Sequence, residues 1–245
     1  MRFASSQVLV TCEHASNCLP PAYGTLGVNS ADLSSHVAWD IGAAKLARTL
    51  TERLDCTSVV GRYSRLLIDL NRSESSPTLI VTRSHGVEIP GNRDLDSSER
   101  RHRIDTYHRP YNAEVERCVR ERIATWGSCL HLSVHSFTPS LDGTNHRNCD
   151  VGVLYHPQRT QEHRIAELLR RELGRTSLRV RRNYPYRGSL DGVQTRMKKM
   201  LEDGAYIGIQ FEVVETVYAD DIRWKKIADA LAAALFHIVT PTNGR

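Results

Sequence analysis

The sequence predicts an α/β fold, a single domain with a mostly parallel (mixed) sheet and helices on both faces. Two observations favour this fold. Short apolar runs of strand length alternate with helical patterns along the whole chain, as they do in parallel sheets that are covered by helices. The chain has 245 residues, enough to bury a large core, and neither an internal repeat nor a domain boundary divides it. We therefore expect residues 1–245 to form one domain.

The first half of the chain begins with an apolar run that predicts a strand at 7–12. Asn29 and Ser30 are good N-caps, and apolar residues follow them at helical spacing as far as Ala44, which predicts a helix that begins near Asn29. The next expected elements are strands near 57–60 and 65–70 and then a long ordered loop or lid over 73–96, a segment rich in Ser, Pro, Gly and Asn.

The second half opens with a basic helical region that begins at Asp96 and runs to about Trp126. Pro110 is expected to divide this region, because proline lacks the backbone N–H that a helix interior needs. The remaining expected elements are strands at 130–135, 150–155, 177–180 and 206–211, helices at 160–173, 192–203 and 220–239, a polar loop at 141–148 and a turn-rich loop at 183–188.

The composition argues against several classes of partner. The formal net charge is +5, but acidic residues are interspersed among the basic ones and no helix-turn-helix, zinc-finger or RNP signature is present. Nucleic acid is therefore not favoured as a partner, and a solvated basic surface that attracts small anionic substrates is the better interpretation. No apolar run approaches the roughly 20 residues that cross a bilayer, so we expect no membrane partner.

The same features predict a cytoplasmic protein. The sequence has no long apolar signal segment near its start. Its six cysteines show no C-x-x-C spacing, which favours reduced thiols over disulfides or a structural zinc module. The sequence gives no basis for predicting an oligomeric state.

Polar side chains mark the carboxyl ends of three predicted strands. His14 follows the strand at 7–12, His135 ends the strand that begins at Leu130, and Glu212 follows the strand at 206–211. Open α/β sheets place their chemistry at this edge. A single histidine after a strand is more often a structural hydrogen bonder, but two imidazoles and a carboxylate together predict one metal-centred site. Signatures of serine hydrolases, zincins, P-loop enzymes and dinucleotide-binding enzymes are absent.

A series of short motifs resembles the N-formylglutamate amidohydrolase family, which is related to the zinc carboxypeptidase and aspartoacylase-like hydrolases. The resemblance covers nearly the whole chain, through Glu13–Asn17, His36–Asp40, Arg62–Arg65 with Asp69–Arg72, Tyr107–Tyr111, Val134–Ser136, Asn183–Gly188 and Phe211–Glu212. It implies a phosphorylase/hydrolase-like (zinc carboxypeptidase-like) fold with one zinc, or another divalent metal, per chain. It also implies hydrolysis of a small anionic N-acyl amino acid such as N-formylglutamate, which yields formate and the free amino acid.

The third metal ligand is less clear than the two histidines, His14 and His135. In related enzymes a glutamate ligand follows the first histidine by three residues, but Asn17 stands there, and an amide is a poor zinc ligand. We therefore expect Asp40 to be the third ligand, with His36 one helical turn away as a ligand or as a partner that orients one. Two alternatives remain open at this point: Glu13 as the ligand, or His36 and Asp40 as a mere pair on a helix surface.

Glu212 is expected to act as the general base. Because it follows an apolar strand, its carboxylate should be partly desolvated and its pKa raised. Such a group can take a proton from metal-bound water and return it to the departing amine, and the related families have a glutamate in the corresponding place. The alternatives are that Glu212 is a salt-bridged carboxylate at the sheet edge, or that Glu215 is the base.

Several residues are expected to bind the substrate. Asn71 and Arg72 match the pair that holds the substrate carboxylate in the related hydrolases, and a guanidinium binds carboxylate through two parallel hydrogen bonds. An arginine, Arg72 in this hypothesis, also stabilises the oxyanion of the tetrahedral intermediate. Arg65 and Arg187 are candidates to hold a second carboxylate. The resemblance adds three candidates for the pocket lining: Asn17, His108 and Tyr111.

Two other functions remain compatible with the sequence. The first is a deacylase or small peptidase that acts on a different N-acyl amino acid, because a sequence does not measure pocket width. The second belongs to another class, a non-catalytic basic protein that binds RNA on this scaffold.

Overall fold

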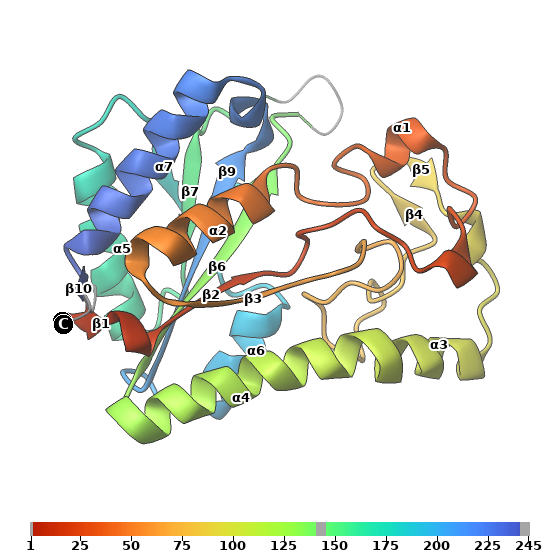
Figure 1. The fold of residues 1–245 in the computed structure, drawn as a ribbon, viewed down its shortest axis with the longest axis horizontal. Coiled ribbons are helices and arrows are strands. Elements are labelled where there is room, and N and C mark those ends of the chain that lie inside the picture. Colours follow the sequence, from red (N-terminus) through yellow and green to blue (C-terminus); the bar gives the residue numbers. More distant parts are fainter. Residues whose placement is uncertain (1, 141–145, 241–245) are drawn as a thin grey trace.

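A six-stranded sheet forms the centre of the computed structural model, which describes residues 2–140 and 146–240 (Figure 1). Its strands lie in the order β3-β2-β6-β9-β7-β8, with the bounds β2 Val8–Cys12, β3 Thr57–Val60, β6 Cys129–Phe137, β7 Val151–Leu154, β8 Val180–Arg182 and β9 Tyr206–Val214. Neighbouring strands run parallel except β7 and β9, which are antiparallel. The predicted mixed, mostly parallel sheet is confirmed.

Helices cover both faces of this sheet (Figure 1). One face carries α2 (Ala43–Leu54), α5 (Thr160–Leu173) and α7 (Asp221–Phe236), and the other carries α4 (Arg109–Trp126) and α6 (Val193–Met200). The alternation of side chains along a strand explains how one strand serves both layers. Val8 and Val10 of β2 belong to the core that includes α2, whereas Leu9 between them packs with Val115 of α4 and Met197 of α6.

The smaller elements flank the sheet. Near the chain ends, β1 (Phe3–Ala4) pairs in parallel with β10 (Val239–Thr240). On the other side of the molecule, away from α5 and α7, lie α1 (Ser30–Leu33) and a hairpin of β4 (Arg83–Ser84) and β5 (Val87–Glu88) (Figure 1). Helix α3 (Ser97–Arg103) precedes α4. No helix in the described part of the chain is long and apolar enough to cross a membrane.

The predicted helix from Asn29 through Ala44 is wrong. Helix α1 ends at Leu33, turns follow, and α2 starts only at Ala43 after Gly42, whose φ of +77° lies in the left-handed region. The apolar residues that suggested one stripe divide between two clusters: Val37 packs in a local cluster with Leu26 and Leu66, whereas residues from Ala43 onward join the main core. Helical periodicity alone does not show that these residues belong to two different hydrophobic clusters.

The predicted strand at 65–70 is also wrong. Its apolar residues are buried, but Leu66 joins one local cluster while Leu67 and Ile68 join another. The segment therefore turns between them, and it pairs with no strand in the described part of the chain. The long loop that follows, at 73–96, is confirmed, and it contains the β4–β5 hairpin.

Pro110 does not divide its helical region. A short π-helix at Ile104–His108 joins α3 to α4, and Pro110 falls in the first turn of α4, where a missing N–H is tolerated. The helix at 160–173 is confirmed, the helices at 192–203 and 220–239 are shorter than predicted, and the strand expected at 177–180 lies at β8. Of the polar loop at 141–148, residues 141–145 lie outside the described residues.

Candidate active site

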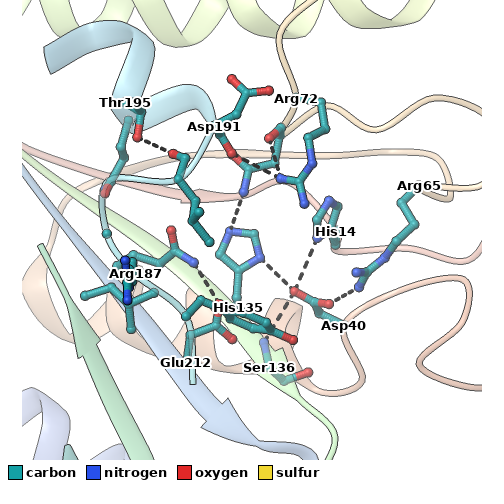
Figure 2. Close-up of a pocket in the computed structure, with 18 of the residues that line it drawn as sticks. His14, Asp40, Arg65, Arg72, His135, Ser136, Arg187, Asp191, Thr195 and Glu212 are labelled. Atoms are coloured by element: carbon teal, nitrogen blue, oxygen red, sulfur yellow. Dashed lines mark hydrogen bonds and ion pairs between the residues drawn. The ribbon is translucent and has the colours of Figure 1, made fainter. Parts of the chain in front are cut away.

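A cavity of about 330 Å³ opens beside the carboxyl-terminal halves of β6 and β9 (Figure 2). Its lining comes from segments far apart in the sequence and includes ten residues of interest: His14, His36, Asp40, Arg65, Asn71, Arg72, His85, His135, Arg187 and Glu212. This volume lies at the lower end of the range for small-molecule pockets, about 300–1,000 Å³, and suits a ligand of amino-acid size.

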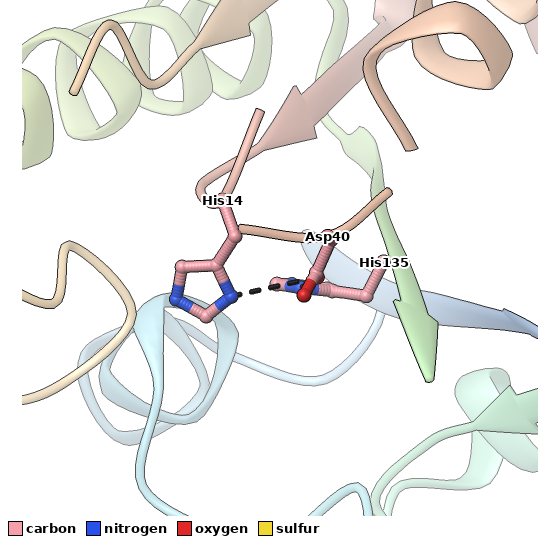
Figure 3. A group of neighbouring side chains, drawn as sticks. All are labelled: His14, Asp40 and His135. Atoms are coloured by element: carbon pink, nitrogen blue, oxygen red, sulfur yellow. Dashed lines mark hydrogen bonds and ion pairs between the residues drawn. The ribbon is translucent and has the colours of Figure 1, made fainter. Parts of the chain in front are cut away.

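Two of the predicted histidines meet Asp40 at this cavity (Figure 3). Nδ1 of His135 lies 2.7 Å from Oδ2 of Asp40, and Nδ1 of His14 lies 3.5 Å from the same oxygen. The two imidazole rings are 5.1 Å apart at 69°. All three residues are buried, and ligand atoms from each lie within 4.8 Å of one another, the only such cluster among the described residues. His14 follows β2, His135 lies within β6, and Asp40 lies in the turn before α2.

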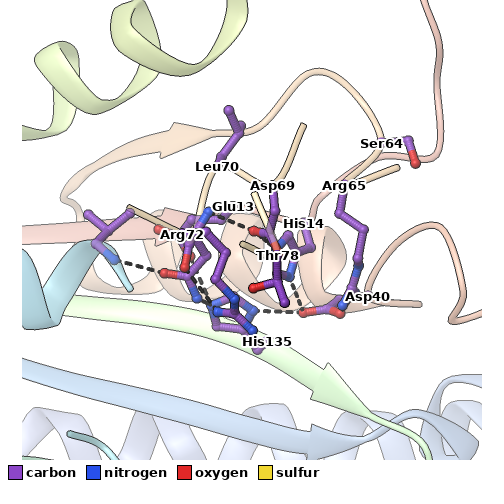
Figure 4. A network of polar contacts seen from close by, with 12 residues as sticks. Glu13, His14, Asp40, Ser64, Arg65, Asp69, Leu70, Arg72, Thr78 and His135 are labelled. Atoms are coloured by element: carbon purple, nitrogen blue, oxygen red, sulfur yellow. Dashed lines mark hydrogen bonds and ion pairs between the residues drawn. The ribbon is translucent and has the colours of Figure 1, made fainter. Parts of the chain in front are cut away.

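A second carboxylate lies behind each histidine (Figure 4). Nε2 of His14 lies 2.8 Å from Oδ1 of Asp69, and Nε2 of His135 lies 2.9 Å from Oε2 of Glu13. Burial alone would raise the pKa of Glu13, but its contacts with His135 outweigh burial and hold that pKa well below the usual range. His14 does the same for the pKa of Asp69. Each carboxylate therefore fixes one nitrogen of its histidine and leaves Nδ1 for Asp40.

This donor set fits a zinc ion. Zinc takes imidazole nitrogen and carboxylate oxygen, and histidine ligands of metals usually donate their other N–H to a carboxylate. Burial would raise the pKa of Asp40, but Arg65 and the two histidines hold it well below its usual range, so the carboxylate is ionised. Together with Glu13 and Asp69, Asp40 makes three buried carboxylates around two imidazoles. Arg65 offsets part of this negative charge, and a divalent cation would balance the rest.

Glu212 lies on β9 directly opposite His135 in the strand register. It is not at the end of its strand, as the sequence suggested, because β9 continues to Val214. One carboxylate oxygen accepts a hydrogen bond of 2.7 Å from Gln210, while the other, Oε2, is buried without a partner in the described structure. Burial raises the pKa of Glu212 to about 7. A carboxyl group with this pKa can both accept and donate a proton near neutral pH.

The three arginines of the cavity differ in the partners that they already have within the protein. Arg65 pairs with Oδ1 of Asp40 (Figure 2). Arg72 donates to the backbone oxygens of Asn71, at 3.0 Å, and Asp191, at 3.1 Å. Arg187 is an exposed residue of the cavity lining, and its guanidinium has no hydrogen-bond or ion-pair partner in the described part of the chain. Arg187 is thus the cation most available to an anionic ligand.

Asn71 is held between α6 and the cluster of His14, Asp40 and His135. Its Oδ1 accepts a 2.9 Å hydrogen bond from the backbone N–H of Val193, and its Nδ2 lies 3.5 Å from Nε2 of His135. The amide therefore borders the cavity in a fixed orientation.

Other predicted site residues lie outside the cavity lining. Nδ2 of Asn17 donates to the carbonyl of Leu33 at 2.9 Å. The imidazole of His108 lies 2.8 Å from the carbonyl of Arg72. The hydroxyl of Tyr111 donates to Oε1 of Glu13 at 3.2 Å. His108 and Tyr111 thus contact residues of the site, Arg72 and Glu13, whereas Asn17 contacts the backbone of α1.

His36 lines the cavity but lies beside Glu215, 3.2 Å away, and not beside Asp40. A helical pairing of His36 with Asp40 is wrong, because residues 34–42 are not helical. Sequence reasoning named Asp69 only as part of a motif and missed its contact with His14. The sequence did contain a signal for this contact, because a carboxylate within the apolar run from Leu66 to Leu70 is expected to be buried with a partner.

The chain is a hydrolase of the amidohydrolase class, built on a mixed α/β sheet with buried histidines and carboxylates gathered at one cavity. The family model for N-formylglutamate amidohydrolase matches residues 6–219, and the chain belongs to this family.

Two solved structures are similar to this chain. The gene product Atu2144 from Agrobacterium tumefaciens has 34% identity and a TM-score of 0.86, over 96% of this chain and 91% of that one. N-formylglutamate amidohydrolase from Ralstonia eutropha JMP134 has 19% identity and a TM-score of 0.74, over 96% and 93% of the two chains, and shows the shared fold. No curated protein matches the chain significantly.

Proposed function

We propose that the protein is a zinc-dependent amidohydrolase that cleaves the N-acyl amide of an amino acid such as N-formylglutamate, giving formate and the free amino acid. Residues 1–245 would act as one catalytic domain. One observation carries the proposal: two imidazoles, each oriented by a buried carboxylate, converge on Asp40 beside the unpartnered oxygen of Glu212. Membership of the amidohydrolase family supports the same reaction class.

His14, Asp40 and His135 would hold the metal. When bound, zinc lowers the pKa of a coordinated water toward about 7 and polarises the acyl carbonyl. Arg65 holds Oδ1 of Asp40 and thereby leaves Oδ2 directed at the two imidazoles. In this proposal Arg65 therefore orients the metal ligand Asp40. Other cations of the cavity, and not Arg65, would bind the second carboxylate of the substrate.

Glu212 moves the proton. Its Oε2 accepts a proton from the attacking water, and the resulting carboxylic acid donates that proton to the nitrogen of the departing amino acid. A pKa of about 7 suits both steps, because neither direction of transfer is strongly uphill at neutral pH. Gln210 fixes the other oxygen, Oε1, and so restricts the rotation of the carboxyl group.

The cations of the cavity bind the anionic substrate. Arg187 is free to form two parallel hydrogen bonds with a carboxylate. Arg72 and the amide of Asn71 bind a second carboxylate or the developing oxyanion, and Arg72 would exchange its backbone contacts for these bonds. A cavity of about 330 Å³ suits a substrate with a small acyl group. Six free cysteines support a reducing compartment, and we place the enzyme in the cytoplasm.

Metal content and turnover test the proposal together. We expect purified wild-type protein to hydrolyse N-formylglutamate, and His135→Ala to bind one zinc fewer and to lose activity. His102→Ala, at an exposed histidine, is the matched control and should change neither quantity. Equal zinc content in wild type and His135→Ala would remove the metal centre from the proposal. A parallel assay of N-formyl, N-acetyl and larger N-acyl glutamates assigns the acyl group.

A further inference from the structure

A second pair of histidines lies at the wall of the same cavity, and its geometry is close to that of the first pair. The rings of His36 and His85 are 5.4 Å apart at 72°, and the rings of His14 and His135 are 5.1 Å apart at 69°. Two imidazoles that bind one tetrahedral ion have ring centres about 5 Å apart, as follows from zinc–nitrogen bonds of about 2.0–2.1 Å. Both pairs meet this separation.

A carboxylate accompanies the second pair, as Asp40 accompanies the first. Oε2 of Glu215 lies 3.2 Å from Nδ1 of His36. Two ligands of one tetrahedral zinc ion stand about 3.3 Å apart, again from the usual bond lengths. The separation of these two atoms is thus the one that a shared ion would impose.

Neither of these two atoms has a satisfactory hydrogen bond. Nδ1 of His36 and Oε2 of Glu215 are both buried, and neither makes a hydrogen bond of acceptable geometry in the described structure. His36 itself is only 8% exposed. Buried polar atoms without a hydrogen bond are uncommon in native proteins, and an ion bound between these two atoms would satisfy both.

The backbone directs His85 toward His36. His85 and Gly86 form the two-residue turn of the β4–β5 hairpin, with φ values of +47° and +86°. Positive φ is uncommon for residues other than glycine, and such a residue is a reason to look for a function at this position. The hydroxyl of Ser84 donates to the carbonyl of Val37 at 3.1 Å, which ties the tip of the hairpin to the residue after His36.

We propose that His36, Glu215 and His85 form a second divalent-cation site, separate from the cluster of His14, Asp40 and His135. Two imidazoles and one carboxylate are the donor set that zinc and similar transition metals prefer. Because His36 and His85 line the cavity, a cation there borders the substrate and can bind a substrate carboxylate. The guanidinium of Arg65 is paired with Asp40, whereas Glu215 pairs with His36.

Binding at this second site requires an adjustment of His85. Among the described residues, only His14, Asp40 and His135 have ligand atoms that all lie within 4.8 Å of one another. His85 is exposed and lies at the tip of a two-residue turn, where a rotation of its side chain would bring the ring toward the other two ligands.

Zinc stoichiometry tests the proposal. The full-length protein is equilibrated with Zn²⁺, freed of excess metal and analysed for zinc per chain. We expect about two zinc ions in wild type and about one in His36→Gln and in Glu215→Gln. His237→Gln is the matched control. His237 also lies near a glutamate, Glu172 at 3.5 Å, but it is half exposed and outside the cavity. This variant should keep about two zinc ions. About one zinc ion in wild type and in both variants would overturn the second site.

The same series separates this proposal from the proposed function. Loss of zinc in His36→Gln and Glu215→Gln, with a further ion lost only when His135→Ala is added, supports two independent sites. Zinc that is lost in His135→Ala alone, while His36→Gln matches wild type, overturns the second site and leaves the hydrolase proposal intact. A lower Tm in Glu215→Gln with unchanged zinc content would show that His36 and Glu215 form a structural pair only, which also overturns the proposal.

Discussion

Glu13 offers a direct test of how the site is built, because its only proposed role is to act through His135. Its carboxylate is buried and accepts from Nε2 of His135 at 2.9 Å, from Ser133 at 2.9 Å and from Tyr111 at 3.2 Å. In Glu13→Gln the shape is retained, and the amide oxygen can still accept from His135 and Ser133. The change therefore removes the negative charge and leaves the packing in place.

The magnitude follows from that loss of charge. A hydrogen bond to a charged group stabilises by about 1.5–3 kcal/mol and a neutral one by about 0.5–1.5 kcal/mol, so about 1–1.5 kcal/mol of orienting energy is lost. This corresponds to about a tenfold weaker metal affinity, at the lower end of the usual effect of such partners, about 10- to 100-fold. Activity should fall when zinc is scarce and recover when zinc is added.

The assay is a zinc dissociation constant from competition with a chelator. Glu121→Gln is the matched control, because Glu121 pairs with Arg117 on an exposed surface of α4. Asp69→Asn should weaken zinc binding comparably through His14. A Glu13→Gln enzyme with the wild-type dissociation constant would refute the argument that buried carboxylates orient the two histidines.

The other predictions concern catalysis, binding and stability. Glu212→Gln should retain zinc and lose turnover by about 100-fold or more, measured as kcat; near-normal turnover would exclude Glu212 as the base. Arg187→Ala should raise KM for a dianionic substrate about tenfold or more with little change in Tm, and an unchanged KM would place the substrate carboxylates elsewhere. Burial lowers the pKa of His131 to about 4, so the unfolded chain binds a proton that the folded chain excludes. The contribution of His131 to stability should therefore fall by about 2 kcal/mol between pH 7 and pH 5, while the raised pKa of Glu212 acts in the opposite direction. The His131 contribution is measured in urea unfolding as the difference in pH dependence between wild type and His131→Gln; equal pH dependence in the two proteins would contradict it. Gly42→Ala should lower Tm and weaken zinc binding, because a Cβ there would lie 2.1 Å from the ring of Tyr218 and would displace the turn that carries Asp40; an unchanged Tm would contradict this packing.

The sequence by itself determined the elements whose burial is local and regular. Alternation along β6 identified His135 as a residue on the polar side of a central strand, and the helix at Thr160–Leu173 has the predicted bounds. The sequence also identified His14, Asp40 and Glu212 as candidates, and the family resemblance was confirmed by the match over residues 6–219. Periodic patterns predict such elements because burial on one face of a strand or helix selects apolar residues at regular spacing.

The tertiary structure alone decided which side chains meet. Asp40 reaches the two histidines from an irregular turn, because the left-handed Gly42 ends that turn and starts α2. Asp69 and Glu13 bind the far nitrogens of His14 and His135, and His36 turns to Glu215. These contacts join segments from distant parts of the chain. Strand register and turn geometry determine them, and neither leaves a periodic signal in the sequence.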